Sequence, residues 1–304
     1  MKNLEEEIIG IKALELKAKE IVKGFLIGQH KSPMHGYSVE FAEHKMYNTG
    51  ESTRHIDWKL FARTEKLYQK KYEEETNLRC QIIIDTSSSM LYPKDTKTNK
   101  LQFSIYSAAA LIQLMLQQRD GVGISLCSDN IEKHLPAKLQ HTHIQYIYSI
   151  LSDLQKNNHQ QLLKKTNIAN ALHQLAEIIH QRSLVIIFSD MFEHDSENVF
   201  AALQHLRYRK HDVIVFHTLD YNTELNFDFE NRPYQFIDME TGEEIKVHSI
   251  EYKDYFQKLM QTFLNELQEK CHQYKIDFVP VDIKNTYYSV LQEYLIKRSK
   301  LLKK

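Results

Sequence analysis

Two carboxylates and a pair of serine hydroxyls stand where strand-like runs of the sequence end. Asp85, Ser87 and Ser89 alternate directly after the apolar run at residues 80–84, and Asp190 follows another run of the same kind. Carboxylate and hydroxyl oxygens are the ligands of hard cations such as Mg²⁺, which prefers octahedral oxygen coordination and keeps several waters. These residue types therefore predict a divalent-metal site, provided that the fold brings the two segments together.

A third loop would add another hydroxyl, because Thr166 precedes a segment with helical periodicity. The same residues also have a purely structural interpretation, in which Ser87 and Ser89 cap the following segment and Asp190 is a turn residue. We favour the metal interpretation because the strand order expected for this chain places Asp190 beside the loop that begins at Asp85.

The elements that must position these residues alternate between strand and helix from Arg79 onward. Near-continuous apolar runs of strand length are typical of parallel strands buried on both faces. Strands are predicted at residues 80–85, 122–127, 131–135, 184–189, 213–218 and 276–281, and helices at 101–118, 144–154, 168–180, 197–209, 250–274 and from 287. The third strand is predicted at an edge, joined to the second by a hairpin, and another hairpin is predicted as an insertion near residues 232–248.

This alternation predicts an α/β fold with a doubly wound, mostly parallel six-stranded sheet and helices on both faces. In the common strand order 3-2-1-4-5-6, the first and fourth strands are neighbours at the topological switch point, where ligands bind outside the carboxyl ends of the strands. The ends of the strands at residues 80–85 and 184–189 are therefore expected to border the ligand crevice.

The first quarter of the chain has a different pattern. An amphipathic helix opens it, with apolar residues at every third or fourth position, but between Gly28 and Tyr72 this periodicity breaks and Gly, Pro, His and paired charges dominate. We expect residues 1–78 to form an N-terminal helix and an irregular or β segment packed on the core. Residues 79–304 are expected to form the α/β domain with its inserted hairpin.

Composition restricts the classes of partner and compartment. The formal net charge of -1 over 304 residues leaves no overall basic field, so neither nucleic acid nor an anionic membrane is the expected partner. No apolar run approaches the roughly 20 residues of a membrane span, and acidic residues stand where a signal peptide would be basic. Cys80, Cys127 and Cys271 lie far apart in apolar patterns, which indicates buried thiols in a reducing compartment. We therefore expect a cytoplasmic location.

The candidate metal ligands also resemble a known site. Asp85-x-Ser87-x-Ser89, Thr166 and Asp190 are similar to the metal-ion-dependent adhesion site of von Willebrand factor A domains. The resemblance implies a von Willebrand factor A-like core, in which the two serines and the threonine bind the ion directly or through water. The two aspartates would act through water, and a carboxylate from a partner protein would complete the coordination shell.

A second motif lies upstream and is more specific. Gly50, Arg54, Asp57, Trp58 and Arg63, in their spacing, resemble the signature of the domain-of-unknown-function 58 family. That resemblance implies a bacterial or archaeal protein, often encoded beside a MoxR-type AAA+ ATPase and thought to act with it in assembling or maturing other complexes. For the motif itself we favour a structural role, in which Arg-Asp pairs and the indole hold an irregular segment together.

The chain departs from that family in two places. Glu51-Ser52 follows Gly50 where the family commonly has two aspartates, and Lys164-Lys165 precedes Thr166 where paired glycines are usual. The two lysines would either weaken cation binding or attract an acidic partner.

Three functions remain open from the sequence. The favoured one is a non-enzymatic, metal-dependent protein-binding module that holds Mg²⁺, Mn²⁺ or Ca²⁺ and works with a MoxR-type ATPase or its client. The second is a metal-dependent hydrolase or phosphotransferase that uses Asp85, although the sequence has no phosphate-binding glycine loop, no nucleophile elbow and only eight glycines. The third is a structural interaction domain without metal.

Overall fold

The computed structural model of the protein describes nine segments of the chain. They are residues 2–29, 44–46, 58–65, 67–70, 78–94, 98–156, 167–192, 196–239 and 242–301. The chain divides into two compact units, of which the first contains Met1–Phe25 with Leu78–Lys304 and the second contains Leu26–Asn77.

The first unit is built on a six-stranded sheet. Its strands are β3 (Arg79–Asp85), β4 (Gly121–Cys127), β5 (Ile131–Lys138), β6 (Leu184–Ser189), β7 (Asp212–Leu219) and β10 (Asp277–Asp282). They lie in the order β10-β7-β6-β3-β4-β5, and every neighbouring pair is parallel except β4 and β5. Counted along the chain, this is the order 3-2-1-4-5-6, so the predicted sheet and its strand order are confirmed.

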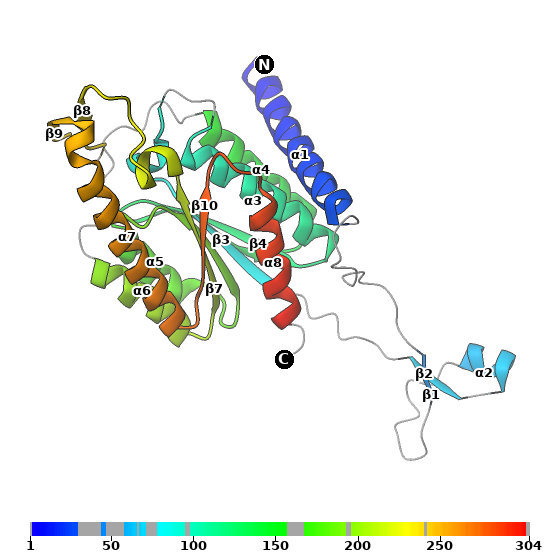
Figure 1. Cartoon of the computed structure of the whole chain (residues 1–304). Helices are drawn as coiled ribbons and strands as arrows, with labels where there is room; N and C mark the ends of the chain where they lie inside the picture. The colour runs from blue at the N-terminus through cyan, green and yellow to red at the C-terminus, as the bar shows by residue number, and fades with distance from the viewer. Residues whose placement is uncertain are drawn as a thin grey trace. The chain divides into compact units, whose positions relative to one another are not determined.

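Helices cover both faces of the sheet (Figure 1). One layer contains α1 (Lys2–Gln29), α3 (Lys100–Gln117), α4 (His141–Lys156) and α8 (Tyr288–Leu301), and the other contains α5 (Ile168–Ile178), α6 (Ser196–Tyr208) and α7 (Ser249–Gln273). Ile82 and Ile84 belong to the first core cluster, whereas Ile83 belongs to the second. Burial on both faces explains why β3 reads as an uninterrupted apolar run.

Strand β5 continues beyond its predicted end at Leu135 and reaches Lys138. Pro136 lies inside it, where the pairing with β4 shifts register. A proline is tolerated there because an edge strand has one side without ladder hydrogen bonds. Gly123 of β4 is required at the shift, since a Cβ atom on it would lie 2.5 Å from the Leu135 carbonyl oxygen.

The predicted insertion is present between β7 and α7. A five-residue helical turn, η4 (Tyr221–Leu225), follows β7, and the antiparallel hairpin of β8 (Pro233–Ile237) and β9 (Glu244–His248) comes next. Phe227 contacts the rings of Phe229, Phe236 and Phe256. This aromatic cluster attaches the hairpin to α7.

The second unit contains a short antiparallel pair, β1 (His44–Met46) and β2 (Tyr68–Lys70), and the helix α2 (Trp58–Thr64). Trp58 begins α2, and Arg63 lies exposed in its last turn. Gly50, Arg54 and Asp57 lie outside the described residues, so the predicted pairing of this motif stays a prediction.

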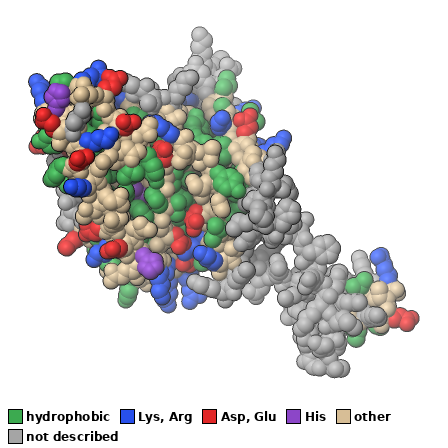
Figure 2. Space-filling model, in the orientation of Figure 1, with side chains coloured by type: hydrophobic (Ala, Val, Ile, Leu, Met, Phe, Trp, Pro, Cys, Tyr) green, Lys and Arg blue, Asp and Glu red, His purple; other side chains and the backbone are tan. Residues whose placement is uncertain are grey.

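The surface carries both signs of charge. On the face seen in Figure 2, acidic and basic side chains intermingle across the first unit. Among the described residues, no helix is both long and apolar enough to cross a membrane.

Candidate metal centre

The two predicted loops meet at the carboxyl ends of neighbouring strands. β3 and β6 are parallel, with Ile84 opposite Phe188, so Asp85 and Ser189 are the next residues along. The Ser189 hydroxyl donates a hydrogen bond of 2.6 Å to Oδ2 of Asp85. The sheet therefore brings the two segments together at its topological switch point, as the strand order predicts.

Asp85 is a buried carboxyl group whose hydrogen bonds come from uncharged donors. Its side chain is inaccessible to solvent, and Oδ1 accepts a 2.9 Å hydrogen bond from the Ser87 backbone N–H. Burial, reinforced by the charge of Asp190, raises the pKa of Asp85 to about 7, although hydrogen bonds from Ser189 and Ser87 act in the opposite direction. A positive charge beside this group would lower its pKa and stabilise the carboxylate.

Two serine hydroxyls lie next to this carboxylate along the chain. The Oγ atoms of Ser87 and Ser89 are 3.0 Å apart, and Ser87 is fully buried. A short 3-10 turn, η2 (Ser88–Leu91), follows Ser87, but the Ser87 side chain makes no capping hydrogen bond to it. Ser87 therefore does not cap this turn through its side chain, and the two hydroxyl oxygens lie together beside Asp85.

Asp190 differs from Asp85 because a lysine neutralises it. Lys100, the first residue of α3, is fully buried, and its Nζ donates to Oδ2 of Asp190 at 2.7 Å and to Oε1 of Glu224 at 2.6 Å. Burial by itself lowers the pKa of Lys100, but the two carboxylates outweigh it, so the pKa lies above its ordinary value. Lys100 is therefore a fixed positive charge inside the candidate site.

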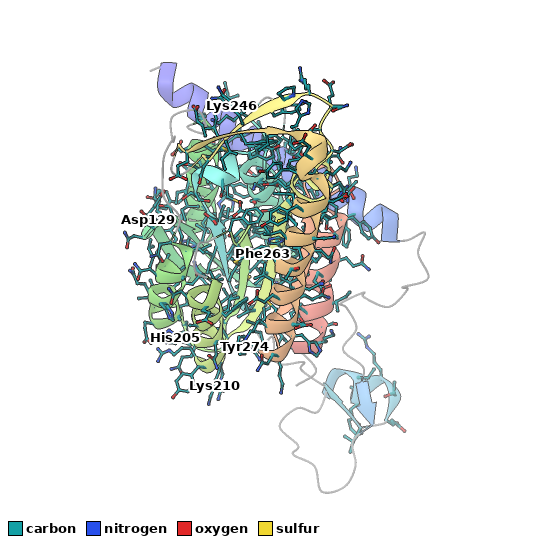
Figure 3. The ribbon with its side chains drawn as sticks, turned by 60° about the vertical axis from the view of Figure 1, so that its left-hand side comes forward. Asp129, His205, Lys210, Lys246, Phe263 and Tyr274 are labelled. Carbon is teal, nitrogen blue, oxygen red and sulfur yellow. The ribbon has the colours of Figure 1, made fainter. Side chains whose placement is uncertain are left out.

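The backbone of Asp190 is held from the neighbouring strand β7. The His217 Nε2 lies 2.7 Å from the Asp190 carbonyl oxygen, and because a carbonyl only accepts, Nε2 carries the proton. Burial lowers the pKa of His217 to about 4, which keeps the ring neutral. Phe263, labelled on α7 in Figure 3, stacks on Phe192 with ring centroids 5.5 Å apart and so covers the loop after Asp190.

The loop after β6 also has an unusual backbone conformation. Met191 has φ of 53°, in the left-handed region that residues with a side chain rarely adopt. Its N–H donates to the Ser189 hydroxyl at 2.9 Å, and the Phe192 N–H donates to Oδ1 of Asp190 at 3.3 Å. These two bonds hold the strained loop in place, and strain of this kind is common at functional sites.

The structure thus groups four of the five predicted ligands and adds residues that sequence reasoning missed. Asp85, Ser87, Ser89 and Asp190 come from two neighbouring loops, whereas Thr166 lies outside the described residues. The residues missed are Lys100, Ser189, His217 and Glu224. Two of them left a signal in the sequence: His217 interrupts an apolar strand, and Lys100 puts a cation at a helix start, where the dipole disfavours it.

The donor set fits a hard divalent cation. Among the described residues no three His, Cys, Asp or Glu side chains converge as a metal site, so an ion bound here needs the serine oxygens as ligands. Once Asp85 is ionised, the three carboxylates of Asp85, Asp190 and Glu224 face the one ammonium of Lys100, which leaves two negative charges uncompensated. Oxygen-only ligands and excess negative charge suit Mg²⁺, Mn²⁺ or Ca²⁺ better than a softer metal.

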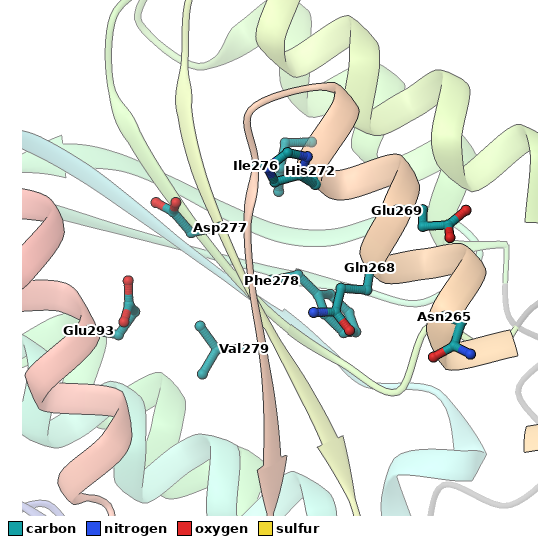
Figure 4. A pocket seen from close by; sticks show the side chains of 9 residues that line it. All are labelled: Asn265, Gln268, Glu269, His272, Ile276, Asp277, Phe278, Val279 and Glu293. Carbon is teal, nitrogen blue, oxygen red and sulfur yellow. The ribbon is translucent and has the colours of Figure 1, made fainter. Parts of the chain in front are cut away.

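A separate cavity of about 560 Å³ lies along the edge strand β10, between α7 and α8 (Figure 4). It is lined by Asn265, Gln268, Glu269, His272, Ile276, Asp277, Phe278, Val279 and Glu293. No residue of the candidate metal centre lines it, and Lys297 neutralises Asp277 at 2.7 Å. The cavity is therefore not part of the metal centre.

Comparison with protein families places the chain. The family described as "Protein of unknown function DUF58" matches residues 43–262, and the chain belongs to this family. Uncharacterized proteins Rv1480 of Mycobacterium tuberculosis and Mb1516 of Mycobacterium bovis are each 23% identical to it over 180 residues. That alignment covers 59% of this chain, which spans 56% of the length of these curated relatives.

Two solved structures are also similar. The conserved hypothetical protein BatB from Bacteroides thetaiotaomicron matches 73% of this chain and 99% of its own, with 14% identity and a TM-score of 0.45. An aerotolerance-related membrane protein from Bacteroides fragilis matches 71% of this chain and 98% of its own, with 18% identity and the same TM-score of 0.45.

Proposed function

We propose that this member of the DUF58 family is a metal-ion-dependent protein-binding module with a von Willebrand factor A-like core. The observation that carries the proposal is the state of Asp85, which is fully buried, adjacent to a second buried carboxylate and, among the described residues, bonded only to uncharged donors. Such a group is costly to bury as an anion unless a cation accompanies it.

In this proposal, the hydroxyls and the carboxylates of the site have different roles in binding the ion. Ser87 and Ser89 would bind the ion, and Asp85 and Asp190 would orient its waters and balance its charge, with Thr166 as a further hydroxyl by resemblance. The ion would offer a coordination position to an acidic side chain of a partner. The adjacent Ser189 and His217 hold the two aspartates in position through the bonds described above.

A binding role is favoured over catalysis by the burial of Asp85. A nucleophile or a base needs access to its substrate, whereas Asp85 is inaccessible and both of its oxygens accept hydrogen bonds. The partner that the family resemblance suggests is a MoxR-type AAA+ ATPase or its client in the cytoplasm. The chain would then serve as an adaptor in the assembly or maturation of other proteins.

Thermal unfolding tests the metal part of this proposal. The wild type and the Ser87→Ala/Ser89→Ala variant are unfolded with chelator and with millimolar Mg²⁺ or Mn²⁺. A ligand that binds only the native state raises stability by mass action, so the metal should raise the wild-type midpoint and leave that of the variant unchanged. Equal midpoints with and without metal in the wild type would count against a metal centre in the free protein.

Partner binding is tested separately with a purified MoxR-type ATPase from the same source. The immobilised wild type should retain the ATPase in Mg²⁺ and release it in chelator, and the double serine variant should not retain it. If neither chelator nor the two substitutions changes the retention of the ATPase, the result would support an interaction domain in which metal has no role.

A further inference from the structure

The candidate metal centre contains a built-in cation. The Lys100 ammonium is fully buried and bridges Asp190 and Glu224 at 2.7 and 2.6 Å. Aromatic rings lie on two other sides, with the Tyr92 centroid at 5.9 Å and the Phe192 centroid at 5.4 Å from Nζ. These contacts fix the position of the ammonium next to the Asp190 carboxylate, which the proposed ion would also use.

Glu224 is held as firmly as the lysine that it neutralises. Its second oxygen, Oε2, accepts a 2.7 Å hydrogen bond from the Asp220 N–H, and its own N–H donates to the Asp220 carbonyl oxygen at 2.8 Å. Both bonds join Glu224 to Asp220, the N-cap residue of the η4 turn, so local backbone structure pre-positions the carboxylate beside Lys100. Nothing in this arrangement requires Glu224 to touch the ion.

Because Lys100 and Glu224 carry opposite charges, their effects on the affinity for a bound cation have opposite signs. Lys100 contacts Asp190 itself and repels a cation there, whereas Glu224 pairs with the same ammonium and screens that repulsion. In a buried site such interactions are only weakly damped by solvent.

We propose that Lys100 and Glu224 act as a paired internal counter-charge that sets the divalent-cation affinity of the metal centre. The inference rests on the proposed metal site but assigns the control of affinity to residues outside the ligand set. Lys100 lowers the affinity of the free chain for a divalent cation. Glu224 partly neutralises Lys100 and so makes this decrease in affinity smaller.

The test is a double-substitution cycle with Mn²⁺ as the probe. Free Mn²⁺ is measured by electron paramagnetic resonance in titrations of the full-length wild type, Lys100→Met, Glu224→Gln and the double variant, at mildly alkaline pH. Lys100→Met should bind Mn²⁺ at least about tenfold more tightly than the wild type, and Glu224→Gln at least about tenfold more weakly. The double variant should lie nearer to the wild type than Glu224→Gln does.

Opposite signs separate this inference from a purely structural role, because damage to the fold would weaken binding in every variant. Lys138→Met is the matched control: Lys138 is exposed and pairs with Val122 at the amino end of β4, away from the metal centre, so its loss should leave the affinity unchanged. If Lys100→Met does not fold, the Mn²⁺ affinity of Glu224→Gln is compared with that of the double variant. The inference then requires the double variant to bind Mn²⁺ more tightly, because it also lacks the Lys100 charge.

Each result has one meaning. Wild-type binding that Lys100→Met leaves unchanged or weakens contradicts the counter-charge role, while the metal centre stands. Binding by Lys100→Met alone supports the counter-charge role and contradicts metal binding by the free wild type. The absence of Mn²⁺ binding from the wild type and from every folded variant contradicts both.

Discussion

Two buried aspartates at opposite ends of the same sheet have opposite surroundings. Asp120 precedes β4 at the amino end, and Asp85 closes β3 at the carboxyl end, and neither side chain is accessible to solvent. Asp120 accepts hydrogen bonds from Arg298 at 2.6 and 3.2 Å and from the Tyr294 hydroxyl at 2.9 Å. Within the part of the chain that the structure describes, Asp85 accepts only from uncharged donors, Ser189 and the Ser87 N–H.

The difference lies in the counter-charge. A two-oxygen pairing between an arginine and a carboxylate satisfies both charge and geometry, so Asp120 joins α8 to the loop before β4 as a structural contact. Asp85 has comparable burial but no such partner among the described residues, and its pKa is raised to about 7. Burial alone therefore does not distinguish a structural carboxylate from a candidate metal ligand, so the hydrogen-bond donor must be compared as well.

The largest effect is expected at the amino end. Asp120→Asn leaves the buried Arg298 without its carboxylate and should lower the free energy of unfolding by about 3–5 kcal/mol in urea denaturation. Asp153→Asn on the exposed surface of α4 is the control, with a change within about 0.5 kcal/mol. A loss at Asp120 no larger than in the control would show that the pairing with Arg298 is not a structural contact.

The matching substitution at the carboxyl end should have the opposite sign. The pKa of Asp85 is raised above its unfolded value of about 3.9, so the folded state is penalised increasingly as pH rises from about 4 to about 7. In chelator above pH 7, Asp85→Asn should raise the free energy of unfolding, by an upper limit of about 4 kcal/mol. The gain should disappear near pH 4, and a loss of stability above pH 7 would contradict the comparison.

A smaller effect is expected from His217, which links the carboxyl-end loop to β7. Its pKa of about 4 lies below the unfolded value of about 6.5, so the stability it contributes is complete above about pH 6.5 and is lost as pH falls. Between about pH 6.5 and 4, the wild type should lose roughly 3 kcal/mol more than His217→Gln. His141→Gln, at an exposed position, should keep the wild-type profile; if His217→Gln does so too, His217 titrates like an exposed histidine.

The sequence predicted the parts of this fold that local pattern encodes. The apolar runs at residues 80–84 and 184–188 are buried on both sheet faces, so they were recognisable as strands, and the standard strand order then placed Asp85 near Asp190. The ends of β5 were harder to predict, because Pro136 normally terminates a strand and is tolerated here only at the sheet edge.

The charge partners could not be predicted in the same way. Lys100 meets Glu224 across 124 positions of sequence, and Asp120 meets Arg298 across 178. No periodicity relates such pairs, because they depend on how α3, η4 and α8 pack after the sheet has formed. The sequence therefore indicated the candidate ligands, and the structure was needed to show which carboxylates already have a cation.

The most direct test of the central claim is calorimetric titration of Mg²⁺ into the wild type and Asp85→Asn, both freed of metal by chelation and held above pH 7. The account predicts one bound ion in the wild type and an affinity at least about tenfold lower in Asp85→Asn, because the substitution removes a charge beside the ion. Equal affinities in the two proteins, or no binding by the wild type, would contradict the assignment of the carboxyl end of the sheet as a metal centre in the free protein.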